Sequence, residues 1–478
     1  MGPEHHENGR WEGLREVFRM AWPIMLGAIS FTVMDFVDKV FVSRLGEDNL
    51  AAVGSAGIWS YTLGVFFLGI AGCVSTFAAQ SLGRGNTEDC ARYAWQGIYI
   101  SFASGIAALG LWPLADELFG LMGHSPEVTR LEIVYFRVRL FGYVFIAWQG
   151  ALAAFFQAVN RPIVPMYVSL VANALNVLLD WLLIFPHGSL LPGWGIAGAG
   201  VATVVSLAVQ VALLQAVFLG PSVNKAFTTR QNLRFNRAKF RDLLRIGWPA
   251  GVSSFLDVAS WSIFTSFLVG RFATFQLAAH TAAISIMHLT FIPALALNFA
   301  ITAIVGQWVG RGNIAVAKAR TYTTVKVCVF YMVTVGVLIA SVGDTLMGVF
   351  SSDPAIIELG HTLLILAAIF AGFDAVAIVV NGALRGAGDT RWLMWALFIG
   401  SYFVQLPLAY FFSGPFGLEA QGAWIGATIY VILISGVVFM RFKGEKWRHI
   451  KIFSEASAEG EPANAPSSAD PETDLSSL

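Results

Sequence analysis

The sequence predicts an all-α polytopic membrane protein with twelve membrane-spanning helices, and three observations favour this fold class. The 478 residues are 56% hydrophobic and only 13% charged, whereas soluble domains carry about 25% charged residues. Apolar runs near the roughly 20 residues that a spanning helix needs recur along the whole chain. Four aspartates that we single out, Asp38, Asp180, Asp257 and Asp374, nevertheless lie inside these runs, where a carboxylate costs roughly 2.5–3.5 kcal/mol on insertion scales.

Twelve apolar runs are long enough to cross a bilayer, and several are longer, which indicates tilt or turns that project beyond it. The first 18 residues mix acids, bases and two histidines, so no cleavable signal is expected and the first run becomes the first helix. The runs lie near residues 20–42, 52–82, 92–112, 132–158, 163–185, 196–219, 247–270, 276–309, 321–342, 358–384, 392–412 and 421–441.

Basic residues predict the orientation of the chain. The loop after the sixth run carries seven Lys and Arg residues against the single acid Asp242, and the segment after the last run is also basic. The opposite loops hold only Arg44, Arg130 and Arg271. Because Lys and Arg accumulate in cytoplasmic loops, we expect a multi-pass protein of the cytoplasmic (inner) membrane with both termini in the cytoplasm.

The chain also contains a tandem repeat. The segment QSLGRGN at residues 80–86 returns as QWVGRGN at residues 307–313, an offset of 227, and LAA at residues 50–52 returns at residues 277–279 with the same offset. Each half holds six runs, an even number, so both halves point the same way. We therefore expect two six-helix lobes related by an axis along the membrane normal.

The repeat and the charge pattern together predict the domain organisation. The stretch from about Ser454 onward has six acids, no bases and little apolar content, so we expect it to be disordered and dispensable. The predicted segments are a cytoplasmic N-terminal tail (1–18), an N-lobe (19–219), a basic cytoplasmic linker (220–244), a C-lobe (245–441) and a cytoplasmic tail (442–478).

Two acidic positions stand out in the predicted N-lobe. Asp38 lies toward the far end of the first run, where it is either paired with a base at the outer interface or a titratable carboxylate in an outward-facing cavity. Asn176 and Asp180 are four residues apart in the fifth run and so share one helix face. Their oxygens suit a hard cation such as sodium or a hydrogen-bonded proton site, while interhelical hydrogen bonding is the structural alternative.

Two further aspartates, Asp257 and Asp374, lie well inside the seventh and tenth runs. At this depth an unpaired side chain facing lipid is disfavoured, and a purely structural role needs a buried basic partner. The runs offer few such partners, namely Lys326, Arg137 and Arg139. No carboxylate occupies the repeat-equivalent positions of the first half, so the lobes are expected to share a backbone plan but not one chemistry.

Pro23 stands near the start of the first run. If the helix begins near Trp11, Pro23 is interior and a candidate for a bend, whereas in a first turn it would be harmless. The sequence contains no nucleotide-binding, metalloprotease or nucleophile-elbow motif, so no enzyme is predicted. Zero net charge predicts no nucleic-acid partner, and the three scattered cysteines form no metal or disulfide pattern.

Three motifs resemble signatures of the multidrug and toxic compound extrusion (MATE) family: FVDKVFVSRLG at residues 36–46, LAAVG at residues 50–54 and LRGAGDT at residues 384–390. The resemblance covers about residues 15–441 and implies two six-helix lobes and drug efflux by cation antiport. It also implies that Pro23 corresponds to a proline at which the first helix of family members is proposed to bend.

The resemblance implies two sets of site residues. Those of the DinF-like branch, an N-lobe cation site, are Asp38, Asn176, Asp180 and Thr203. Asp257 and Asp374 match acidic positions of the NorM-like branch, although Asp257 replaces a glutamate. Phe370 stands where a tyrosine is expected, and Thr281 where a glutamine is expected, which weakens a NorM-like sodium site. No metal is expected beyond sodium at these cation sites.

These patterns predict a cation-coupled antiporter, driven by protons or sodium, that exports amphipathic and often cationic drugs and toxic compounds by alternating access. It would act as a monomer without a cofactor. An ionised aspartate in a low-dielectric cavity attracts a cationic compound, and an incoming proton or sodium ion cancels that attraction. The alternatives are a flippase for a lipid-linked precursor, which would show a more basic cavity, and a channel or sensor without an exchange cycle.

Overall fold

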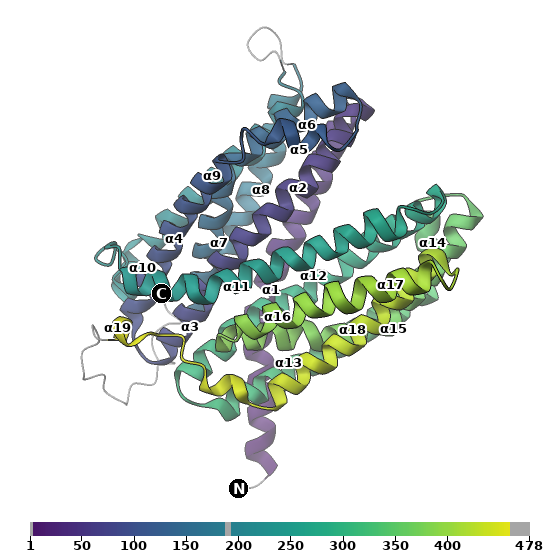
Figure 1. The fold of residues 1–478 in the computed structure, drawn as a ribbon. Helices are drawn as coiled ribbons and strands as arrows, with labels where there is room; N and C mark the ends of the chain where they lie inside the picture. Colours follow the sequence, from purple (N-terminus) through teal and green to yellow (C-terminus); the bar gives the residue numbers. More distant parts are fainter. Residues whose placement is uncertain (1–2, 187–192, 459–478) are drawn as a thin grey trace. The chain divides into compact units, whose positions relative to one another are not determined.

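The computed structural model describes residues 3–186 and 193–458, and every regular element in these ranges is a helix (Figure 1). Ten helical segments among them are long and apolar enough to cross a membrane. The pair α6 (Pro126–Leu140) and α7 (Tyr143–Ala158), bent by 45°, makes an eleventh if it forms one span. The predicted run at residues 92–112 overlaps α4 (Thr87–Leu109), so each of the twelve predicted spans falls on a helix or helix pair.

The chain forms two compact units, which we describe separately. Unit 1 contains the described residues of Met1–Ala28, Pro249–Val305 and Asn313–Ile450, and unit 2 contains those of Ile29–Trp248, Gly306–Gly312 and Lys451–Leu478. Most of the predicted C-lobe lies in unit 1 and most of the predicted N-lobe in unit 2. The exact lobe boundaries and the orientation in the membrane stay predictions.

Unit 2 is a helical bundle in which α4 packs on α7, and α2 packs on both α6 and α7 (Figure 1). A core of buried aliphatic and aromatic side chains, among them Phe119, Phe136 and Tyr143, fills its interior. Its other helices are the later part of α1 (Pro3–Ser43), α2 (Glu47–Gly72), α3 (Val74–Gly83), α5 (Ala115–Gly120), α8 (Ile163–Ile184), α9 (Ile196–Phe218), α10 (Pro221–Phe227), the first part of α11 (Arg237–Ile263) and α19 (Glu455–Ala458).

Unit 1 is a second bundle, in which α15 packs on both α13 and α18. Two of its membrane-length segments contain short π-helical stretches, η1 (Phe264–Val269) and η2 (Ser401–Gln405). The end of α12 (Thr274–Gly310), from Gly306 on, belongs to unit 2 and the rest to unit 1. The other elements of unit 1 are the first part of α1, the later part of α11, α13 (Ile314–Ser341), α14 (Gly343–Gly348), α15 (Pro354–Ala387), α16 (Thr390–Gly400), α17 (Leu406–Ser413), α18 (Glu419–Lys443) and η3 (Lys446–His449).

Helices α1 and α11 each contribute to both units, and each has a proline inside it. Pro23 lies well within α1, which begins at Pro3, and Pro249 is the first residue of α11 that belongs to unit 1. A proline inside a helix lacks the N–H that would bond to the carbonyl four residues earlier. Pro23 therefore occupies an interior position, as a bend candidate requires, while bending itself stays a prediction.

The two copies of the repeated heptapeptide contact each other within unit 2. A Cβ atom added at Gly83 would collide with the backbone carbonyl of Gln307, and one added at Gly310 would collide with the carbonyl of Gln80. The contact is reciprocal, because each copy places its glycine against the glutamine backbone of the other. Only residues without a side chain allow two backbones to approach this closely.

The predicted linker, residues 220–244, contains α10 and the start of α11 and packs along α4. The Trp95 indole N–H donates to the Thr229 carbonyl at 2.8 Å, and the Arg92 guanidinium donates to Asn232 at 2.9 Å. The predicted disorder from about Ser454 falls mostly on residues 459–478, which lie outside the described residues.

Candidate functional site

Asp38, Asn176 and Asp180 meet between α1 and α8 in unit 2. The side-chain amide of Asn176 is assigned with its nitrogen toward the carboxylates, because the opposite orientation would set its oxygen against acceptors only. In this assignment the nitrogen donates to Asp38 Oδ1 at 2.9 Å and to Asp180 Oδ2 at 3.3 Å. The two carboxyl groups also lie within hydrogen-bonding reach of each other. The structure thus brings together three of the four N-lobe residues that the sequence singles out.

A second polar contact fixes α8 against α1. Asn173, which stands three residues before Asn176, donates a hydrogen bond to the hydroxyl of Ser30 at 2.8 Å. Asn173, Asn176 and Asp180 follow one another at spacings of three and four residues, which places them on a single face of α8. Helix α8 begins after Pro162 and ends just before Pro186, so prolines bound the helix that carries this face.

The Asp180 carboxylate is buried and incompletely satisfied. Asn176 and Asp180 have no exposed surface, while Asp38 is half-buried. Asp180 Oδ1 has no hydrogen-bond partner among the described residues. Buried polar atoms are nearly always bonded, and two ionised carboxylates in contact repel each other. A proton shared by the pair, or one cation between them, would remove that repulsion.

Helix α6 contributes two neighbours to this site, of which the sequence patterns named only Arg139, as a possible basic partner of Asp257 or Asp374. Tyr135 is buried and interacts electrostatically with both Asp38 and Asp180. Arg139 interacts with Asp38 and lies just before the bend between α6 and α7. The sequence could not reveal these neighbours, because residues 135 and 139 are far from Asp38 and Asp180 along the chain.

Thr203 of α9 behaves differently from the other three predicted N-lobe residues. Its hydroxyl donates to the carbonyl of Ala199 at 3.0 Å, within its own helix. Helix α9 packs on α8, so Thr203 belongs to a neighbouring helix of the site. Its hydroxyl proton, however, is directed to the backbone rather than to a carboxylate.

The acidic pair of unit 1 is formed by Asp257 on α11 and Asp374 on α15, which interact electrostatically. Asp257 is exposed and Asp374 is half-buried. Arg385 of α15 is the basic residue that interacts electrostatically with Asp257. Its guanidinium also donates a hydrogen bond of 3.5 Å to the Ser254 hydroxyl. Arg385 belongs to the LRGAGDT motif, and sequence reasoning did not connect it with Asp257.

His280 has a structural environment. It is fully buried, its Nδ1 accepts a hydrogen bond from the Trp424 indole at 3.0 Å, and its Nε2 lies 2.9 Å from the Thr265 hydroxyl. Because an indole N–H can only donate, Nδ1 carries no proton. Both ring nitrogens are therefore occupied within unit 1, which leaves none for a ligand.

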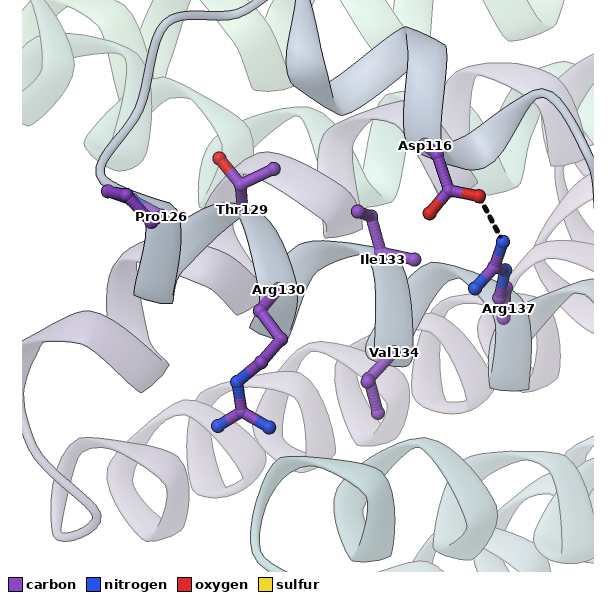
Figure 2. A pocket seen from close by; sticks show the side chains of 7 residues that line it. All are labelled: Asp116, Pro126, Thr129, Arg130, Ile133, Val134 and Arg137. Carbon is purple, nitrogen blue, oxygen red and sulfur yellow. Dashed lines mark hydrogen bonds and ion pairs between the residues drawn. The ribbon is translucent and has the colours of Figure 1, made fainter.

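A surface hollow of about 460 Å³ lies between α5 and α6 of unit 2 (Figure 2). Figure 2 shows the ion pair that joins Asp116 and Arg137 at one end of it. None of the predicted site residues lines this hollow. Arg137, which the sequence offered as a possible partner of Asp257 or Asp374, instead forms an ion pair with Asp116. The lining residues are Asp116, Pro126, Thr129, Arg130, Ile133, Val134 and Arg137.

The fold and these acidic sites define a class: a polytopic helical membrane protein with carboxylates inside its bundles. The MatE family model matches residues 23–182 and 249–411. The chain therefore belongs to the MatE family, and it is a transporter rather than an enzyme.

Relatives and solved structures agree with this assignment. The chain is 27% identical over 439 residues to "Probable multidrug resistance protein NorM" of Thermotoga maritima, covering 91% of this chain and 93% of that protein. It is 30% identical over 462 residues to a protein of the same name from Mesorhizobium japonicum, covering 92% and 96%. A structure of a MOP superfamily transporter from Pyrococcus furiosus matches with a TM-score of 0.82 at 22% identity, covering 90% and 95%. At 22% identity, the match to the Pyrococcus furiosus structure shows a shared fold and nothing more.

Proposed function

We propose that this protein is a cation-coupled antiporter that exports amphipathic, often cationic compounds across the inner membrane by alternating access. The relatives named as probable multidrug resistance proteins support drug export. The observation that carries the coupling proposal is the contact among Asp38, Asn176 and Asp180, with one carboxylate oxygen of Asp180 buried and unpartnered within the described residues. The protein would act as a monomer and need no cofactor besides its coupling ion.

The proposed exchange follows from charge. With the carboxylate pair ionised, its negative charge in a bilayer of low dielectric attracts a cationic compound. A proton or sodium ion that enters from outside binds to the carboxylate pair and neutralises the same negative charge. The hydrogen bonds from Asn176 hold the two carboxylates in position for this ion. Compound and ion then compete for one site, so an inward ion gradient drives outward movement of the compound.

In this proposal Asp257 and Asp374 form a second cation or drug site in unit 1. Their mutual repulsion and the nearby Arg385 set how strongly a cation binds there. For this pair to serve as a site, an aqueous path must reach Asp257, whose side chain is not covered by other residues of the chain. Thr203 can contribute its hydroxyl oxygen to a cation at the N-lobe site while it donates its proton to the Ala199 carbonyl.

Efflux of a fluorescent cation from cells carrying Asp38→Asn tests the proposal. We expect the variant, at wild-type membrane abundance, to lose most of its efflux. The neutral asparagine side chain lacks the negative charge for which the cationic compound and the coupling ion compete. Wild-type efflux would overturn the role of Asp38. A flippase for a lipid-linked precursor is the alternative, and rescue of a strain defective in such a precursor would favour it.

A further inference from the structure

The chain segment after α18 returns to unit 2 and packs against it. It enters unit 2 at Lys451, and we call residues Ile452–Ser457 the C-terminal strap. Ile452 is 1% exposed and Ser457 is 5% exposed, so both ends of the strap are buried. Composition predicts disorder from about Ser454, yet the packing continues to Ser457.

An aromatic socket holds the strap at Phe453. The ring of Phe453 meets Phe77 of α3 edge-on, with centroids 5.7 Å apart, and meets Tyr93 of α4 at 5.8 Å. The guanidinium of Arg84, at the end of α3, lies 4.0 Å from the Phe453 ring centroid. Edge-to-face aromatic pairs and a cation over a ring each contribute favourably, so Phe453 is an anchor rather than a loose side chain.

Three residues of α11 hold the strap backbone. Asp242 accepts hydrogen bonds from both the backbone N–H and the hydroxyl of Ser454, each at 3.0 Å. Arg245 donates to the Ile452 carbonyl at 2.7 Å, and Lys239 donates to the Ser457 carbonyl at 3.3 Å. Residues 239, 242 and 245 are spaced by three, so they follow one side of the helix.

The strap also covers a buried ion pair that joins α11 to α4. The Lys239 ammonium lies 2.7 Å from the Asp89 carboxylate, and the two side chains are only 4% and 2% exposed. A buried pair is retained when further hydrogen bonds satisfy the charged groups. The Ser457 carbonyl provides such a bond to the ammonium, so the strap completes this pair.

We propose that the C-terminal strap docks onto α3, α4 and α11 and braces the part of α11 before Pro249, and that transport depends on this docking. Helix α11 leaves unit 2 at Pro249. Once its first turns are fixed, a change in its direction is confined to the proline. The dependence of transport on the strap rests on the proposed antiport function, whereas the docking does not.

Hydrogen exchange of the full-length protein tests the docking without any substrate. We expect the peptide covering residues 451–458 to exchange slowly, with the Ser454 amide protected by Asp242. In Asp242→Ala the peptide should exchange about tenfold faster or more, since a hydrogen bond to a charged acceptor is worth at least one power of ten. Asp242→Asn keeps an acceptor oxygen and should be intermediate. Exchange of the wild-type peptide at the rate of an unstructured chain would overturn the proposal.

A matched pair of truncations tests the role in transport. Truncation after Ala458 keeps every strap contact named above, whereas truncation after Ile450 removes them all. At equal membrane abundance we expect a severalfold lower initial efflux rate from the shorter chain only, and Phe453→Ala in the full chain should lower it in the same direction. Equal rates from both truncations would refute the transport role. If wild-type protein shows no efflux, the antiport proposal fails, while exchange still decides the docking.

Discussion

Asn176 of α8 donates a hydrogen bond of 2.9 Å to the carboxylate of Asp38 on α1, and its amide nitrogen also reaches Asp180 at 3.3 Å. One neutral side chain thus connects two acids from different helices. An amide donor stabilises a carboxylate without adding a full charge. The total charge of the site can therefore still change by one when a proton or cation arrives.

Asn176→Ala removes the donor shared by both carboxylates. Because a hydrogen bond to a charged group is worth about 1.5–3 kcal/mol, we expect efflux to fall roughly tenfold or more, since about 1.4 kcal/mol corresponds to a factor of ten. Asn173→Ala is the matched control, because it removes a hydrogen bond to Ser30 on the same helix face and leaves the acids untouched. Similar efflux from the two variants would show that Asn176 is only interhelical glue.

Gly83→Ala tests the contact between the repeated heptapeptides. The new Cβ would meet the backbone of Gln307, which cannot move away like a flexible side chain. We expect a loss of stability of about 1–3 kcal/mol, seen as a lower unfolding temperature in detergent, and Gly310→Ala should behave alike. Gly72→Ala is the control, since nothing lies within 4 Å of the added atom. Equal unfolding temperatures would contradict the close approach.

Glu445→Gln gives a stability change that depends on pH. The Lys318 ammonium donates to Glu445, Arg448 adds a second contact at 2.9 Å, and together they hold the pKa of Glu445 below its ordinary value of 4.5. A depressed pKa contributes stability that is present above the ordinary value and is lost as the pH falls through the folded-state value.

The wild-type protein should therefore unfold at a higher temperature than Glu445→Gln at neutral pH, and the difference should shrink below pH 4.5. Unfolding scans in detergent across this range measure it. The exposed Glu358 on α15 provides the control Glu358→Gln, for which we expect little change. A difference that grows on acidification would contradict the assignment.

The helical fold and the positions of its spans could be predicted from the sequence, because each span is a local property of about 20 apolar residues. The shared face of Asn176 and Asp180 was likewise local. The sequence could not show that Asp38 meets this face, that Arg385 is the basic neighbour of Asp257, or that Gly83 touches Gln307. Such contacts join distant parts of the chain, and helical periodicity carries no information about them.

The C-terminal strap illustrates a different limit. The acidic, polar residues after Ser454 dominate the average composition and predict disorder. The strap itself begins two residues earlier, with the apolar residues Ile452 and Phe453. These two side chains pack against unit 2 and hold the following polar residues in place. Composition averaged over a long tail cannot detect so short a docked segment.

The most direct test of the central claim, that the Asp38–Asp180 pair carries ion coupling, is uptake of a fluorescent cation into proteoliposomes with a proton or a sodium gradient imposed singly. We predict that one of the two gradients drives accumulation by the wild-type protein and that Asp180→Asn abolishes this response at equal reconstituted amounts. An undiminished gradient response in Asp180→Asn would contradict the account.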